Sequence, residues 1–395
     1  MMNHKIKHHY FFVLLLGIYS CGSREKFPTD SKLAGTVAFE FLDSVVVESL
    51  SELYIADKDK HTDRLMLNDW EMNEMLITDL KGEMISRIKP RGEGPNQVQS
   101  PLELAFWKEG YIVKEISAGQ HLHFFNSKFE KTATSPALAK EIFLISMPNY
   151  RKSFSVVEKH GKTLMVGYEH NAINAELWNK EEQHAGFYDK AEAGYIYEPA
   201  TGNLSQFNLY PATWRPRLEQ KWVGIAYPLI QANESDQVLA VLPTYGDQLF
   251  YYTLNGAHLE PLTEVTLSHP EREEKASFDV ARDDSSLYPF FDRLSGGGKY
   301  FLIEFTTAFP RELYNSFKAK GENFHMDPEY REASKKYRQT KYILTDTKGN
   351  QAPISELPVP GVVHLLDADD VLYIKPNSDT ELDYNVFYRY QLSLE

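Results

Sequence analysis

The sequence contains a single cysteine, Cys21, so the chain beyond that residue holds no thiol for a Cys-based catalytic dyad. After Cys21, no apolar run reaches the roughly 18 residues that a membrane-spanning helix needs. Basic residues are also scarce, with 42 Lys and Arg against 56 Asp and Glu and a formal net charge of −14. Because phosphate binding depends mainly on basic residues, we expect no nucleic-acid partner. An acidic surface also repels anionic lipid headgroups, so the body of the protein is expected to stand off a membrane.

The N-terminus has the features of a bacterial lipoprotein signal. A start with Lys and His precedes an apolar run at residues 10–19, and Ile18-Tyr19-Ser20-Cys21-Gly22 follows, which resembles a lipobox. The thiolate is the nucleophile that accepts the lipid, so the cysteine is obligatory there. We predict a signal peptide at residues 1–20, acylation of Cys21 and a polar tether at residues 21–34. The alternative is a chance cysteine beside an ordinary cleavage site.

This anchor predicts a location in the cell envelope. Position 22 is Gly rather than Asp, so nothing favours retention in the inner membrane. We expect an outer-membrane lipoprotein, held to the membrane by its lipid alone, and both the periplasmic face and the cell surface remain open.

A hairpin pattern recurs along the chain, with a β-rich run, a turn often centred on Lys-Gly or Asn-Gly, and a second run. The two clearest copies share Thr-Asp-x-Lys-Gly, at residues 78–82 and 345–349. Such runs, bounded by turn residues, are typical of paired β-strands. The six copies and candidate strands lie at residues 76–85, 124–129, 195–202, 250–256, 343–350 and 385–392.

The spacing of these hairpins indicates a β-propeller, because the shorter intervals are close to the ~40–50 residues of one blade. We interpret each hairpin as the outer two strands of a four-stranded blade, which must pack radially against others to bury its faces. The prediction is an all-β, six-bladed β-propeller over residues 35–394, closed by the early strand at residues 36–41. A polar segment at residues 311–341, with Asp327-Pro328-Glu329 as a helix start, is predicted to be a helical insertion.

Several of these motifs resemble a known group of proteins. Lys81-Gly82, Ile85, Ile88 and the following Arg91-Gly92-Glu93-Gly94-Pro95 are similar to the opening of the six-bladed, TolB-like propeller lipoproteins of Bacteroidota. Tyr210-Pro211, Tyr227-Pro228 and residues 239–252 resemble one uncharacterised branch of that group. The resemblance covers most of residues 36–394 and implies a fold and a location rather than an activity.

Catalytic and metal-binding signatures are weak. The sequence has no Gly-x-Ser-x-Gly and no His-Glu-x-x-His. His121 and His123 would share a strand face and could begin a metal site, but ordinary strand histidines are favoured because no third ligand is identifiable. The acids of residues 57–63 alternate as in a calcium loop, yet the turn glycine and closing Glu are missing, so a solvated loop is favoured. We expect no metal and no cofactor, and we assign no catalytic residue.

The strongest ligand candidate is the segment from Trp214 to Trp222, in which two indoles and three cations stand out in an acidic chain. Tryptophan and arginine are enriched at binding hot spots. The possible ligand contacts are Trp214, Arg215, Arg217, Lys221 and Trp222. The alternative, which we favour, is a loop that packs its tryptophans onto the edge of a blade.

These observations favour a non-enzymatic binding or scaffold role in the envelope, with a glycan, a peptide or a partner protein as the ligand. The alternative is an envelope enzyme, such as a glycan hydrolase or lyase, with its site at the mouth of the propeller channel. Two or more convergent acids or histidines with perturbed pKa values in the central pocket would favour the enzyme.

Overall fold

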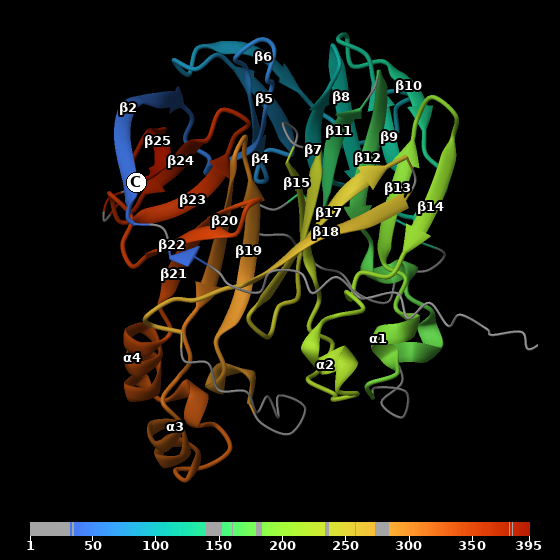
Figure 1. Cartoon of the computed structure of the whole chain (residues 1–395). Helices are drawn as coiled ribbons and strands as arrows, with labels where there is room; N and C mark the ends of the chain where they lie inside the picture. The colour runs from blue at the N-terminus through green and yellow to red at the C-terminus, as the bar shows by residue number, and fades with distance from the viewer. Residues whose placement is uncertain are drawn as a thin grey trace, which may run out of the picture.

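The computed structural model describes residues 32–395, except residues 34, 118, 140–151, 160, 179–183, 234–236, 257, 273–283, 379 and 381. The predicted signal peptide, Cys21 and nearly all of the predicted tether lie outside the described residues. Within the described part, the strands form six sheets arranged radially. The sheets follow one another in chain order, from blue to red in Figure 1. No helix in this part is long and apolar enough to cross a membrane.

The first three sheets follow one another along the chain, and each is an antiparallel meander of four strands. Blade 1 contains β3 (Leu53–Lys58), β4 (Leu65–Asp69), β5 (Glu74–Thr78) and β6 (Met84–Ile88). Blade 2 contains β7 (Pro101–Trp107), β8 (Gly110–Glu115), β9 (Leu122–Phe125) and β10 (Lys131–Thr134). Blade 3 contains β11 (Phe154–Lys159), β12 (Lys162–Tyr168), β13 (Gly194–Glu198) and β14 (Asn203–Phe207).

The remaining sheets complete the ring. Blade 4 contains β15 (Leu229–Asn233), β16 (Val238–Leu242), β17 (Gln248–Asn255) and β18 (His258–Thr266). Blade 5 contains β19 (Phe290–Gly296), β20 (Tyr300–Thr306), β21 (Thr340–Asp346) and β22 (Asn350–Ile354), with the short β1 (Lys32–Leu33) added parallel to β22. Blade 6 contains β23 (Gly361–Leu366), β24 (Val371–Pro376), β25 (Tyr384–Leu394) and β2 (Val37–Glu48).

The ring is closed by pairing an early strand with the last strand. Strand β2 lies antiparallel to β25 from Val37↔Leu394 to Glu48↔Tyr384, and Figure 1 shows the blue strand beside the red one. This confirms the predicted closure by an early strand. It also confirms the six-bladed propeller, because all six predicted hairpins supply outer strands of their blades.

The core is divided among the six seams between neighbouring blades. Strand β4 shows why, because its side chains alternate between the two faces of the sheet. Leu65 and Leu67 pack into the cluster shared with blade 6, whereas Met66 packs into the cluster shared with blade 2. A strand that is buried on both faces therefore reads as a continuous apolar run, and only the outer strands, such as β6, are largely exposed.

The helices lie in connections between strands. The predicted helical insertion is confirmed between β20 and β21, as α3 (Arg311–Lys318) and α4 (Pro328–Tyr337). Asp327 caps α4 by accepting a hydrogen bond from the Glu329 amide at 2.9 Å. Two further short helices, α1 (Phe187–Lys190) and α2 (Arg215–Leu218), were not predicted.

Candidate functional site

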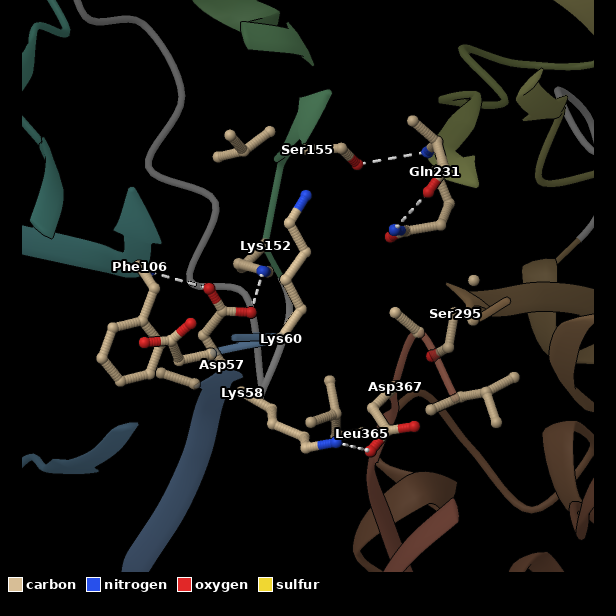
Figure 2. Close-up of a pocket in the computed structure, with 18 of the residues that line it drawn as sticks. Asp57, Lys58, Lys60, Phe106, Lys152, Ser155, Gln231, Ser295, Leu365 and Asp367 are labelled. Carbon is tan, nitrogen blue, oxygen red and sulfur yellow. Dashed lines mark hydrogen bonds and ion pairs between the residues drawn. The ribbon is translucent and has the colours of Figure 1, made fainter. Parts of the chain in front are cut away.

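A pocket of about 140 Å³ lies in the central channel, and the inner strands of all six blades line it (Figure 2). Much of the lining comes from the ends of inner strands and the turns after them, at residues 57–61, 106–108, 295–297 and 365–368. Successive strands of a blade run in opposite directions, so these turns share one end of the channel. Helices α1–α4 lie in connections that belong to the other end. The pocket is therefore at the end of the channel away from the helices.

One charged group in the pocket joins blades 1 and 6. The Lys58 ammonium lies 3.1 Å from a carboxylate oxygen of Asp367 and 2.7 Å from one of Asp369. Burial disfavours the charged ammonium, but the two carboxylates outweigh burial and raise the pKa of Lys58. Asp367 also accepts hydrogen bonds from the Val371 amide and the Tyr373 hydroxyl. These contacts hold Asp367 in the wall of the channel.

Asp57 ties together the first three blades. Its carboxylate accepts a hydrogen bond from the Phe106 amide at 2.8 Å and binds the Lys152 ammonium at 2.5 Å (Figure 2). Nearby, the Lys60 ammonium lies 3.5 Å from a carboxylate oxygen of Glu158. This second pair is much more open, with exposed fractions of 33% and 47% for the two side chains.

The pocket contains one buried histidine, and its contacts are structural. Nδ1 of His364 lies 3.2 Å from the Ile55 amide, from which it accepts a hydrogen bond, and the ring stacks against Tyr54 with centroids 5.8 Å apart. Burial lowers the pKa of His364 well below its ordinary value, and the nearby cations Arg293 and Lys375 lower it further. Because Nδ1 acts as an acceptor, the imidazole is held in its neutral form.

The loop at residues 57–63 was expected to be solvated, and for its first two acids that prediction is wrong. Only 4% of Asp59 is exposed. Its carboxylate accepts hydrogen bonds from the His61 amide and from the side chains of Thr62 and Arg64. Burial favours the neutral acid, but these donors outweigh burial and lower the pKa of Asp59. The loop is folded back on itself and forms part of the channel wall.

The histidine pair of blade 2 has ordinary strand contacts. His123 lies with Nε2 2.8 Å from Glu115 and Nδ1 3.1 Å from the Thr134 hydroxyl. Nδ1 of His121 lies 2.9 Å from the Ser135 carbonyl oxygen. Within the described ranges, no three His, Cys, Asp or Glu side chains are grouped so that they could hold a metal ion.

The segment from Trp214 to Trp222 packs largely into the seam between blades 3 and 4. Trp214 is fully buried, with its ring edge-on to Tyr188 at 4.9 Å and stacked on Tyr210 at 5.7 Å. Trp222 is partly buried and stacks on Tyr188 at 5.2 Å. The suggested ligand contact is therefore corrected for Trp214, because no ligand can reach its ring in this fold. It remains a prediction for Trp222.

The three cations of this segment differ in their surroundings. Arg217 donates to Asp189 at 2.7 Å and also to the Tyr210 carbonyl, so it fastens the loop to α1. Arg215 is half exposed and lies 3.8 Å from Asp247. Lys221 is partly exposed. A ligand contact by any of these cations remains a prediction.

Arg217 also lines a second cavity, of about 370 Å³, between the outer parts of blades 3 and 4. Phe207, Tyr252, Leu259 and Pro261 supply apolar surface there. This cavity has fewer charged groups than the channel pocket, and its lining comes from two blades rather than six.

Sequence reasoning placed the site of the alternative enzyme at the channel mouth but did not identify most residues of the pocket, because they come from strands and turns of six blades, spread over residues 56–368. Gln231 and Ser295, for example, belong to β15 and β19 and face the same space in Figure 2. A signal was available: each inner strand begins a blade, two strands before the outer hairpin that the sequence reveals. The signal is therefore a polar residue at the end of such a first strand, as Asp57 and Ser295 are.

The fold is similar to two solved structures from Bacteroides. A member of the DUF4221 family from Bacteroides vulgatus aligns with a TM-score of 0.63 and 10% identity, covering 92% of this chain and 100% of that chain. A candidate exported protein of Bacteroides fragilis aligns with a TM-score of 0.51 and 8% identity, covering 91% and 95% of the two chains. No family model and no curated protein matches the sequence. At these identities the likeness shows the fold alone.

Proposed function

We propose that this protein is a lipid-anchored propeller of the bacterial cell envelope that binds its ligand in the channel pocket without chemically transforming it. The ligand is a glycan, a peptide or an exposed group of a partner protein. The single observation that carries the proposal is the pocket itself, which all six blades line and which presents a mixture of charged, polar and apolar side chains. Ligand sites are usually concave, and their polar groups fix the orientation of the ligand and provide specificity.

Two acids or histidines of the lining, Asp59 and His364, have perturbed pKa values, which by the criterion above would favour an enzyme. Both groups are engaged in hydrogen bonds that hold the fold, however, and this supports binding rather than catalysis. Asp57 and Asp367 are held by lysines and backbone amides, and the His364 imidazole is held as a hydrogen-bond acceptor. A general acid or base must exchange a proton with the substrate, and each of these groups would first have to give up a contact that joins two blades. Binding needs no such change.

The pocket assignment can be tested by filling the channel. Ser295 lies on β19 and lines the pocket, so Ser295→Phe should block it, whereas Ser393→Phe places the same ring on an exposed position of β25. Full-length wild type and both variants would be applied to a glycan array and to envelope extract. We expect the ligand of the wild type to be retained by Ser393→Phe and lost by Ser295→Phe. Equal retention by both variants would place the ligand outside the channel.

The envelope location rests on the N-terminal sequence, and the similarity to TolB-like lipoproteins and to a candidate exported protein agrees with it. One buried acyl chain gives marginal membrane binding at about 0.8 kcal/mol per methylene, so the two or three chains of a bacterial lipoprotein would make the anchor permanent. Cys21→Ala should therefore leave the protein in the soluble fraction or as an unprocessed precursor. A variant that is still mature and membrane-bound would contradict the anchor.

A further inference from the structure

The acidic and basic side chains of the channel pocket differ in how much of each is exposed. The acids Asp367 and Asp59 lie in the wall, with exposed side-chain fractions of 2% and 4%, and Asp57 has 14%. Lys60 and Lys152 reach further into the open space, with exposed fractions of 33% and 22%. In a chain of net charge −14, the accessible surface of this pocket is therefore rich in ammonium groups.

Lys108 adds a third cation to the lining of the pocket. It is exposed, and its ammonium lies 4.8 Å from the centre of the Trp107 ring, a contact that helps to hold it at the pocket. Against these three lysines, Glu158 is the one lining acid among the described residues with a large exposed fraction, 47%. The accessible charges of the described lining are therefore three ammonium groups and one carboxylate, while the exposed carboxylates of Asp63 and Asp369 lie against the buried Lys58.

The buried acids cannot turn to meet a cation, because each is held by several donors. Asp59 accepts three hydrogen bonds from its own loop, and Asp57 accepts one from the Phe106 amide besides its contact with Lys152. The lysines, in contrast, can still donate hydrogen bonds to a ligand. An ammonium carries three N–H donors, so Lys152 can bind Asp57 and a ligand at the same time.

The volume limits the size of the group that can enter. One water needs about 10–15 Å³ of such space, so the pocket of about 140 Å³ holds on the order of ten water-sized positions. This is the size of one sugar ring or one amino-acid side chain. Ser295 and Gln231 supply polar groups on the opposite wall, where hydroxyls could be bound.

We infer that the channel pocket binds a compact anionic group, a carboxylate, sulfate or phosphate carried by a single sugar-sized residue, with Lys60, Lys108 and Lys152 as its partners. This inference rests on the proposed function and names the ligand class of that site. The acidic outer surface repels the same ligand, which restricts its binding to the channel.

The test uses four probes with the full-length protein: glucuronic acid, glucose 6-sulfate, glucose 6-phosphate and glucose. Isothermal titration calorimetry measures each affinity. We expect the anionic sugars to bind at least about ten-fold more tightly than glucose, because charge-assisted hydrogen bonds are roughly twice as strong as neutral ones. The ranking among the three anions identifies the acidic group.

Variants that remove either a positive or a negative charge from the pocket should change the affinity in opposite directions. Lys60→Gln and Lys108→Gln should each weaken the best anion by about ten-fold, and Glu158→Gln should strengthen it several-fold, by roughly the effect of one exposed charge. Lys162→Gln is the matched control, because Lys162 pairs with Glu198 at 3.0 Å outside the pocket. The substituted side chains are all substantially exposed, and a thermal melt checks that each variant folds.

Two outcomes overturn the inference while leaving the proposed function standing. One is equal affinity for glucose and the anions. The other is no measurable affinity for any anion by a protein whose array ligand is still lost in Ser295→Phe. If Ser295→Phe and Ser393→Phe retain that ligand equally, the proposed function itself fails, whichever probe binds.

Discussion

Replacing Lys114 by Met should lower the free energy of unfolding of this protein far more than replacing a surface lysine does. Lys114 lies on β8 and is 3% exposed, with its ammonium 3.0 Å from Glu169, 3.6 Å from Glu103 and 2.6 Å from the Ser153 hydroxyl. Burial disfavours its charge, but the two carboxylates outweigh burial and raise the pKa of Lys114. The cluster joins blade 2, which holds Lys114 and Glu103, to blade 3, which holds Ser153 and Glu169.

The magnitude follows from what the substitution leaves behind. Glu103 and Glu169 have exposed side-chain fractions of 3% and 7%, so Lys114→Met leaves two buried carboxylates without the cation that they share. Removing one partner of a buried ion pair costs about 3–5 kcal/mol, because an uncompensated charge stays buried. The matched control is Lys162→Met, which removes a lysine that is 63% exposed and should change stability by about 0–1 kcal/mol.

Urea denaturation followed by tryptophan fluorescence measures both variants. The triple variant Lys114→Met/Glu103→Gln/Glu169→Gln should recover much of the lost stability, since it removes the stranded charges as well. The stability difference between wild type and Lys114→Met should also become smaller as the pH falls, because the two carboxylates then take up protons and lose their charge. The reasoning is refuted if Lys114→Met is no less stable than Lys162→Met at pH 7.

Three further predictions concern the body of the propeller. Burial lowers the pKa of His170 to about 4, so below pH 6.5 the unfolded chain binds a proton that the folded chain does not, and up to about 3 kcal/mol of stability should be lost between pH 6.5 and 4. Urea titrations at both ends of that range measure the loss, which His170→Phe should reduce and His258→Phe, at an exposed position, should not. Trp214→Ala should lower stability by about 3–5 kcal/mol in thermal or urea unfolding, whereas Lys221→Ala should change it by about 0.5 kcal/mol or less. Gly82→Val should lower the melting temperature more than Gly202→Val does: both glycines have positive φ, but a Cβ at Gly82 would lie 1.8 Å from the Val46 carbonyl oxygen, whereas nothing lies within 4 Å at Gly202.

The outer hairpins could be predicted from the sequence because their signals are local. A turn such as Asp79–Gly82 is fixed by its own residues: the Asp79 side chain accepts from the amides of Lys81 and Glu83, and Gly82 adopts a φ of +89°. The recurrence of that pattern gave the blade count, because the shorter intervals are close to the length of one blade and the longer ones were interpreted as blades with insertions. The cap of α4 at Asp327 was visible for the same reason.

Which residues share the pocket could not be predicted, because their contacts with one another are not local. Asp57 and Lys152 are 95 positions apart and meet only when three blades close around the channel. An acid in a polar stretch looks solvated until the position of its inner strand is known. The two indoles posed a similar problem, since Trp214 and Trp222 have the composition of a binding site and are placed by aromatic contacts with Tyr188, which lies in a helix that the sequence did not reveal.

The polar contacts near the channel also explain how a binding pocket and a closed ring can share the same strands. Every seam has such a contact. Going round the ring from the seam of blades 1 and 2, the contacts are Asp57 with the Phe106 amide, Lys114 with Glu169, Ser155 with the Ala232 amide, Asn233 with the Gly298 carbonyl, Arg293 with the His364 carbonyl, and Lys58 with Asp367.

These seam residues cannot change without loosening two blades, so they are unsuited to tuning a ligand site. Lys60, Lys108 and Ser295 lie in the same pocket but at the ends of inner strands or in the turns after them, where they are at least partly exposed. Substitutions there should alter what the pocket binds with little effect on the fold. The propeller thus separates the residues that hold its ring together from those available to select a ligand, although both groups face one channel.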